Sequence, residues 1–141
     1  MTFDLDDNLE TTFFSIADVL IPAAEGMPCA SRAEGASDIL RRILALRPDL
    51  KENFLRGVRW SVRESPEAAA RTLQKIDPAA YAAIGTVAAA GYYMSPEVRT
   101  LIGYPGQEKR SFESDAAPEY VANGMLQAVI DRGPIYRPTP K

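Results

Sequence analysis

The sequence contains no histidine and only one cysteine, Cys29, in 141 residues. Without an imidazole, the chain cannot assemble a Ser-His-Asp or Cys-His catalytic group. Histidine metal sites are excluded as well, and one thiol cannot build a structural zinc site, an iron–sulfur cluster or an intrachain disulfide. Cys29 is either a reactive thiol or a small buried residue. The lack of a histidine to activate the thiol favours the buried residue.

Long apolar runs, nucleotide-binding motifs and a net positive charge are also missing. No stretch approaches about 18 uninterrupted apolar residues, which predicts no membrane insertion. The acidic N-terminus shows no basic region or twin arginine, so we expect a cytoplasmic protein without a signal peptide. Neither GxGxxG nor GxxxxGK[ST] occurs, which leaves dinucleotide and P-loop sites without support. The formal net charge of −3 argues against nucleic acid as a partner.

Charge is unevenly distributed along the chain. Residues 1–25 carry acids and no base, whereas residues 32–63 carry mostly bases. Two solvated faces that neutralise each other across the fold would explain this pattern, and so would a basic docking face for an acidic partner. The pairs Asp6-Asp7 and Glu64/Glu67 could in principle act as acid and base. Acidic residues are expected at helix starts, however, so we expect no catalytic residue and no enzyme activity of the chain alone.

Helix-start signals are frequent, and no alternating pattern predicts a strand. Three times a capping residue precedes proline, at Ser65-Pro66, Asp77-Pro78 and Ser95-Pro96. The sequence predicts an all-α, single-domain helical bundle over residues 1–141, with an extended proline-containing tail at 133–141. About seven helices are expected, at residues 7–21, from near 37 to 47, 48–63, 66–76, 78–93, 96–102 and 118–132.

Apolar spacing predicts which helix faces are buried. In the third helix, Phe54 and Val58 should face inward, with Trp60 or Val62 as a further candidate. Ile76 is expected inward at the end of the fourth. The fifth helix, "PAAYAAIGTVAAAGYY", has so little side-chain bulk that neighbouring helices can approach closely, which is typical of a central helix.

Tyrosine and glycine concentrate in "GYYMSPEVRTLIGYPG", residues 91–106. Tyr92 and Tyr93 must point to different sides of a helix, because adjacent residues are about 100° apart. Gly103 should end the sixth helix, and the following turn should present Tyr104 and Pro105. These tyrosines either lock the corner between two helices or bind a partner, for which exposed tyrosine is well suited.

The tail "RGPIYRPTPK" leaves the same choice. Its prolines pre-set the backbone, so that Tyr136 and Arg137 could dock on a partner at little ordering cost. The tail could equally pack on its own domain or be disordered.

Two segments resemble landmarks of one family. "FFSIADVLIPA", residues 13–23, resembles the opening Leu-x-x-x-Ala-Asp-x-Leu-Ile-Pro helix of the gluconate 2-dehydrogenase subunit 3 family. "GYYMSPEVRTLIGYPG" resembles that family's second landmark, a Gly-Tyr/Phe-Tyr segment followed by a Gly-Tyr/Phe-Pro-Gly-like turn. The segments occur in the same order and at roughly the expected separation.

The resemblance implies an accessory role. Members of that family accompany a large flavin-dependent dehydrogenase of the glucose–methanol–choline type, which carries FAD and the chemistry, and they support its maturation. The twin-arginine signal of exported members is missing from this sequence. The resemblance therefore implies a flavoprotein large subunit as partner and no cofactor in this chain. The alternative is a stand-alone module that self-associates or binds a small ligand through its fifth helix.

Overall fold

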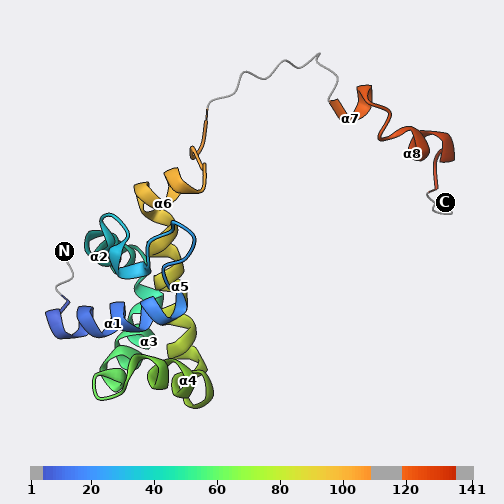
Figure 1. Cartoon of the computed structure of the whole chain (residues 1–141). Helices are drawn as coiled ribbons and strands as arrows, with labels where there is room; N and C mark the ends of the chain where they lie inside the picture. Colours follow the sequence, from blue (N-terminus) through green and yellow to red (C-terminus); the bar gives the residue numbers. More distant parts are fainter. Residues whose placement is uncertain (1–4, 109–118, 136–141) are drawn as a thin grey trace. The chain divides into compact units, whose positions relative to one another are not determined.

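The computed structural model describes residues 5–108 and 119–135, and this part of the chain is all-α (Figure 1). Its only β-type pairing is an isolated bridge between Ala24 and Met27. In chain order, the helices are α1 (Asp7–Leu20), the 3-10 turn η1 (Ala30–Arg32), α2 (Ala36–Leu46), α3 (Pro48–Ser61), α4 (Pro66–Ile76), α5 (Pro78–Met94), α6 (Pro96–Leu101), α7 (Glu119–Ala122) and α8 (Gln127–Arg132). Among these, no helix is both long and apolar enough to cross a membrane.

Capping residues set most of the predicted helix starts. The Asp6 carboxylate accepts from the Asn8 amide at 2.9 Å, and Ser65 and Asp77 cap α4 and α5 in the same way. The third predicted cap is wrong, because the Ser95 side chain makes no capping hydrogen bond to α6. Ser95 is completely buried, and its hydroxyl oxygen has no hydrogen-bond partner.

Contacts divide the chain into two compact units, Met1–Gly106 and Gln107–Lys141, where the sequence predicted one domain. In the first unit, α5 contacts α1, α2, α3, α4 and α6, with α4 at one end of the helix and α6 at the other (Figure 1). Its main core holds apolar residues from α1 to α5, and its largest fully buried side chains are Phe54, Ile16, Leu40, Leu44, Leu73 and Ile84.

Small residues allow α3 and α5 to approach closely, as predicted for a central fifth helix. A Cβ atom on Gly57 of α3 would lie 2.9 Å from the Ile84 Cδ1 atom and 3.0 Å from the Ala80 Cβ atom. Both distances are shorter than ordinary van der Waals contact, so a larger residue at 57 would force its neighbours on α5 to shift. The buried Phe54 ring packs against Phe13 of α1 in a tilted arrangement, with ring centroids 5.1 Å apart and 59° between the ring planes.

Three predicted burials are wrong. Trp60 and Val62 are 38% and 40% exposed, because the inward positions of α3 after Val58 pass to Ser61 and not to a larger apolar side chain. Ser61 keeps its hydroxyl satisfied by donating to the Gly57 carbonyl oxygen at 2.8 Å. Ile76 is 60% exposed, since it ends α4 just where the chain turns towards α5.

The second unit contains two short helices where one, 118–132, was predicted. Gly124, with φ at +79°, lies between α7 and α8 and breaks the helical path. Neither helix has a buried residue. Leu126 is half-buried, and six other apolar side chains of the described segment are exposed by at least 45%: Tyr120, Val121, Met125, Val129, Ile130 and Ile135.

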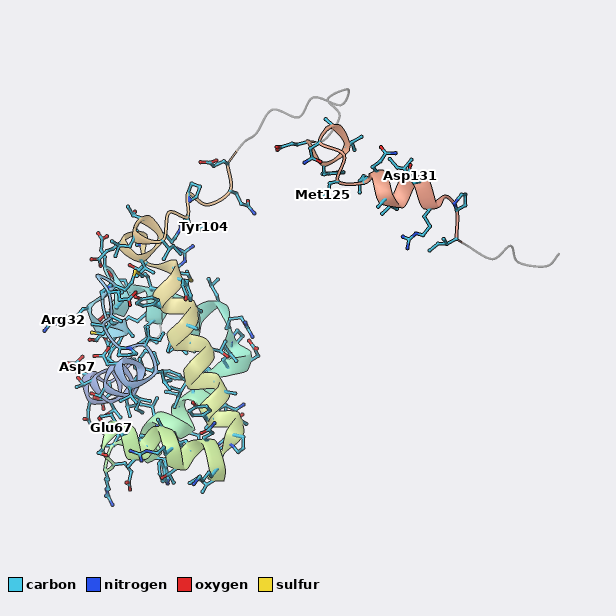
Figure 2. All side chains as sticks on the ribbon, turned by 45° about the vertical axis from the view of Figure 1, so that its right-hand side comes forward. Asp7, Arg32, Glu67, Tyr104, Met125 and Asp131 are labelled. Carbon is cyan, nitrogen blue, oxygen red and sulfur yellow. The ribbon has the colours of Figure 1, made fainter. Side chains whose placement is uncertain are left out.

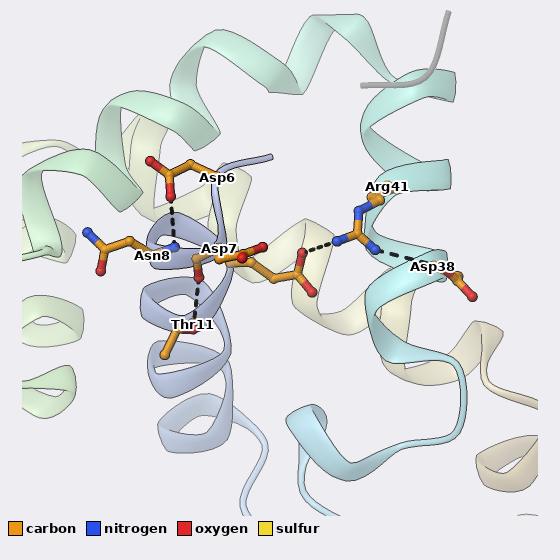
Figure 3. Close-up of polar contacts among 7 residues, drawn as sticks. Asp6, Asp7, Asn8, Thr11, Asp38 and Arg41 are labelled. Carbon is orange, nitrogen blue, oxygen red and sulfur yellow. Dashed lines mark hydrogen bonds and ion pairs between the residues drawn. The ribbon is translucent and has the colours of Figure 1, made fainter. Parts of the chain in front are cut away.

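An ion pair connects the acidic start of the chain to the basic segment that follows. Arg41 of α2 donates from Nη2 to the Glu10 Oε2 atom of α1 at 2.7 Å, and its Nη1 atom lies 3.8 Å from Asp38 (Figure 3). At the end of α1, Asp18 accepts from both the amide and the hydroxyl of Ser31 at 2.7 Å. The acidic α1 is therefore partly neutralised within the first unit.

Candidate functional site

The corner where α5 ends and α6 begins carries most of the tyrosines singled out in the sequence. Tyr92 is buried, 6% exposed, and packs with Ala33 and Val98 in a second, smaller apolar cluster. Its hydroxyl donates to the Pro28 carbonyl oxygen at 2.8 Å. Burial raises the pKa of Tyr92 above its ordinary value, and the neighbouring Tyr93 raises it further, so the phenol stays a neutral donor. Tyr92 therefore fixes the loop after α1 to the end of α5.

Tyr93 faces the other way, as the helical geometry predicted. It is 58% exposed, and its ring meets that of Tyr92 edge to face, with centroids 5.5 Å apart and an 82° angle between the planes. The contact with the buried ring restrains Tyr93 while leaving most of its surface free. Such a side chain suits an interface, because little conformational freedom is lost when a partner covers it.

Arg99 and the turn after α6 form one compact arrangement. Gly103 ends the helix in the left-handed region, with φ at +67°, and the Tyr104 amide donates to the Arg99 carbonyl oxygen at 2.8 Å. The Arg99 guanidinium carbon lies 5.5 Å from the centre of the Tyr104 ring, within reach of a cation–π contact. A Cβ atom on Gly106 would lie 2.5 Å from the Arg99 Nη2 atom, so only glycine fits beside the guanidinium there.

The guanidinium of Arg99 is not fully satisfied within the described residues. Its Nε atom is buried without a hydrogen-bond acceptor. No carboxylate of the described residues forms an ion pair with it at 4.0 Å or less. The nearby Glu97 carboxylate instead accepts from the Glu34 amide at 3.1 Å. Arg99 thus keeps unused hydrogen-bonding capacity beside an exposed aromatic ring.

Exposed apolar side chains precede and follow Arg99 along the chain. We use the name corner patch for Tyr93, Arg99, Leu101, Ile102 and Tyr104. The four apolar members are between 48% and 58% exposed. Figure 2 shows Tyr104 on the chain just beyond α6. Arginine and tyrosine are among the side chains that most often anchor protein interfaces. Single exposed apolar residues are common on protein surfaces, whereas several close together in one short segment are typical of an interaction site.

Of the residues predicted to bind a partner, Tyr93 and Tyr104 belong to the corner patch and Pro105 is exposed beside it. Tyr92 is buried in the core, unlike its neighbour Tyr93, and does not belong to the patch. Tyr136 and Arg137 lie outside the described residues. Leu101 and Ile102 were noted in the sequence only as a short apolar run. Arg99 was missed, because nothing in its sequence context signals that the guanidinium will stack on a ring five residues later.

A small-ligand pocket beside α5, one form of the alternative hypothesis, lacks room. The cavity lined by residues of α1, α2 and α5, Phe13, Leu40, Val87 and Tyr92 among them, holds about 10 Å³. That volume admits at most one water molecule. Among the residues that the structure describes, no three His, Cys, Asp or Glu side chains gather as metal ligands. The sequence favoured a buried Cys29, whereas the residue is half-buried, with its sulfur 3.5 Å from the Ser31 hydroxyl oxygen.

Comparison of the chain with protein-family models, with curated proteins and with solved structures gave no match. The resemblance of residues 13–23 and 91–106 to gluconate 2-dehydrogenase subunit 3 proteins therefore remains a hypothesis from two short segments.

Proposed function

We propose that this chain is a non-catalytic accessory subunit that binds a larger protein through the corner patch. The observation that carries the proposal is the set of exposed side chains at the α5–α6 corner, where Tyr93 and Tyr104 are restrained by intrachain contacts. Restrained aromatic side chains gain interface area without a large ordering cost. A partner that covered the patch would bury four large apolar side chains and enclose Arg99.

The second unit supports a binding role independently. A four-residue and a six-residue helix without buried residues have little to stabilise them in water, because isolated helices of fewer than about 12 residues are marginal. Their hydrogen bonds are local, such as the Gln127 amide to the Asp131 carboxylate at 2.7 Å. Figure 2 shows Met125 and Asp131 on this segment. A partner would supply the burial that the segment lacks.

The proposed partner is the large subunit of a flavin-dependent dehydrogenase, which would carry FAD. This part of the proposal comes from the two sequence segments that resemble gluconate 2-dehydrogenase subunit 3 proteins. The surface itself specifies only a protein with an apolar site that can accept tyrosine and arginine.

Affinity capture from the source organism tests the proposal. The tagged full-length chain should retain a protein with flavin absorbance in stoichiometric amount, and Tyr104→Ala should reduce its recovery about tenfold, as expected for loss of one interface anchor of 1–2 kcal/mol. Leu46→Ala is the matched control, since Leu46 is 65% exposed on α2 and lies outside the corner patch. Recovery of a colourless partner would refute the flavoprotein assignment. Equal recovery by wild type and Tyr104→Ala would refute the corner patch.

Self-association is the second candidate function. The solvent side of α5 consists of small residues, Ala82, Thr86 and Ala89, and a Cβ atom on Gly85 would meet nothing within 4 Å. Two such helices could approach closely in a homodimer. The molar mass of the purified chain in solution decides this, since a monomer over the full concentration range removes the candidate.

A further inference from the structure

A polar groove lies between α1 and the connection from α3 to α4. It has a volume of about 190 Å³ and is lined by Thr11, Thr12, Ser15, Ile16, Ser61, Val62, Glu64 and Pro66. This volume is smaller than the roughly 300–1,000 Å³ of drug-sized sites, so it suits a small ligand. None of the proposed partner-binding residues lines it, and its function does not depend on the accessory role.

The hydroxyl groups of the groove share one property. Each already donates its only proton to the carbonyl oxygen four residues earlier, at 2.8–2.9 Å, in Thr11, Thr12, Ser15 and Ser61. A hydroxyl has one donor and two acceptor lone pairs. The four oxygens therefore offer only lone pairs to anything that enters, and a ligand must bring the donors. Figure 3 shows the first of these bonds, from Thr11 to the Asp7 carbonyl.

Charge in the groove favours the same kind of ligand. Glu64 contributes a carboxylate, and no lysine or arginine is among the lining residues. Arg63 is adjacent in sequence but does not line the groove, and Glu64 forms no ion pair among the described residues. A carboxylate binds ammonium and guanidinium groups about twice as strongly as neutral donors. An anion would meet the carboxylate and four hydroxyl oxygens that can only accept, without a compensating cation among the lining residues.

The remaining lining residues are apolar. Ile16 is buried, Val62 is 40% exposed and Pro66 is half-buried. They can contact a short hydrocarbon chain while its charged end meets Glu64 and the hydroxyl oxygens. We propose that the groove binds a small aliphatic cation with several N–H donors, of the diamine or agmatine class.

Titration calorimetry on the purified full-length chain tests this site without any partner protein. Cadaverine is the probe. Pentanediol has a similar chain without charge, and glutarate has a similar chain with the opposite charge. We expect cadaverine to bind, pentanediol to bind at least tenfold more weakly, and glutarate to give no signal. Glutarate binding as tight as that of cadaverine, or no binding by cadaverine and agmatine, would overturn the proposal.

Two variants locate the binding. Glu64→Gln keeps the shape of the side chain and removes its charge, and it should weaken cadaverine about tenfold. Ser15→Ala removes one acceptor oxygen and should weaken it several-fold. Glu52→Gln removes a charge from an exposed site on α3 that does not line the groove, and it should leave affinity within twofold. Equal weakening by Glu52→Gln and Glu64→Gln would show attraction to the acidic surface in general and would overturn the site. Either failure leaves the capture experiment with Tyr104→Ala unaffected.

Discussion

The first unit encloses a core of completely buried apolar side chains, whereas the helices of the second unit have no buried residue. Phe54, Ile84 and Leu73 of the first unit are at most 1% exposed, whereas Val129 and Ile130 of the second are 52% and 60% exposed. The side chains are of the same chemical kind. What differs is that α1 to α5 pack against one another, whereas among the described residues neither α7 nor α8 buries a side chain.

Polar contacts follow the same division. In the first unit, several side chains join elements that are far apart in sequence, such as the Arg41–Glu10 pair between α1 and α2. In the second, Asn123 and Gln127 bond to residues two and four positions away. The two units thus differ in their long-range contacts and not in the kind of apolar residue that they contain.

The largest expected effect tests whether the two units contribute differently to the stability of the fold. Phe54→Ala removes a completely buried ring that packs against Phe13 and should lower the free energy of unfolding by about 3–5 kcal/mol. Val129→Ala in α8 should change it by no more than about 0.5 kcal/mol. Chemical denaturation followed by circular dichroism measures both. Similar losses for the two variants would show that the second unit contributes to the same core.

A single methyl group provides a smaller test of how tightly the first unit is packed. Gly57→Ala would place its Cβ against Ile84 and Ala80, both completely buried, and should destabilise the fold by about 1–2 kcal/mol despite the better helix propensity of alanine. Gly85→Ala is the matched control on the open side of α5 and should stabilise by about 0.5–1 kcal/mol. A gain at both positions would mean that α3 and α5 do not approach as closely as described.

The helices of the first unit could be predicted because the signals that start and end a helix lie within a few neighbouring residues. Proline after a capping residue located the starts of α4 and α5, and glycine located the end of α6. Long-range information was missing where the predictions were wrong. Ser61 is buried and Trp60 is not, because the Ser61 hydroxyl donates to a carbonyl oxygen of its own helix. A prediction based on the spacing of apolar residues does not consider serine as a core residue.

The candidate sites were less accessible to sequence reasoning. The opposite orientation of Tyr92 and Tyr93 follows from helical geometry alone, although their order, with Tyr92 inward, depends on the Pro28 carbonyl 64 positions earlier. The groove joins Ser15 of α1 to Glu64 after α3, and no short motif contains both. In the sequence, Glu64 is notable only as one member of a carboxylate pair with Glu67.

The smallest expected effect concerns the ion pair that joins α3 to the start of α5. Asp77 accepts from the Arg56 Nε atom at 2.7 Å and also caps α5. The Arg56 hydrogen bond lowers the pKa of Asp77, and the Ala80 amide lowers it further. Because the folded-state pKa is below the unfolded one, the carboxylate stabilises the fold above the unfolded pKa, and this stabilisation is lost as pH falls through the folded pKa.

Asp77→Asn keeps an oxygen for the cap but removes the charge, so it isolates the ion pair. The variant should be slightly less stable than wild type at neutral pH, and the difference should vanish on acidification below the ordinary carboxyl range. A double-mutant cycle with Arg56→Gln, measured by denaturation at both pH values, separates the pair from other effects of each substitution. Both side chains are partly exposed, so added salt should reduce the coupling. A coupling that persisted unchanged in acid would show that Arg56 and Asp77 interact through packing and not through charge, and the α3–α5 contact would then depend on Gly57 and its neighbours alone.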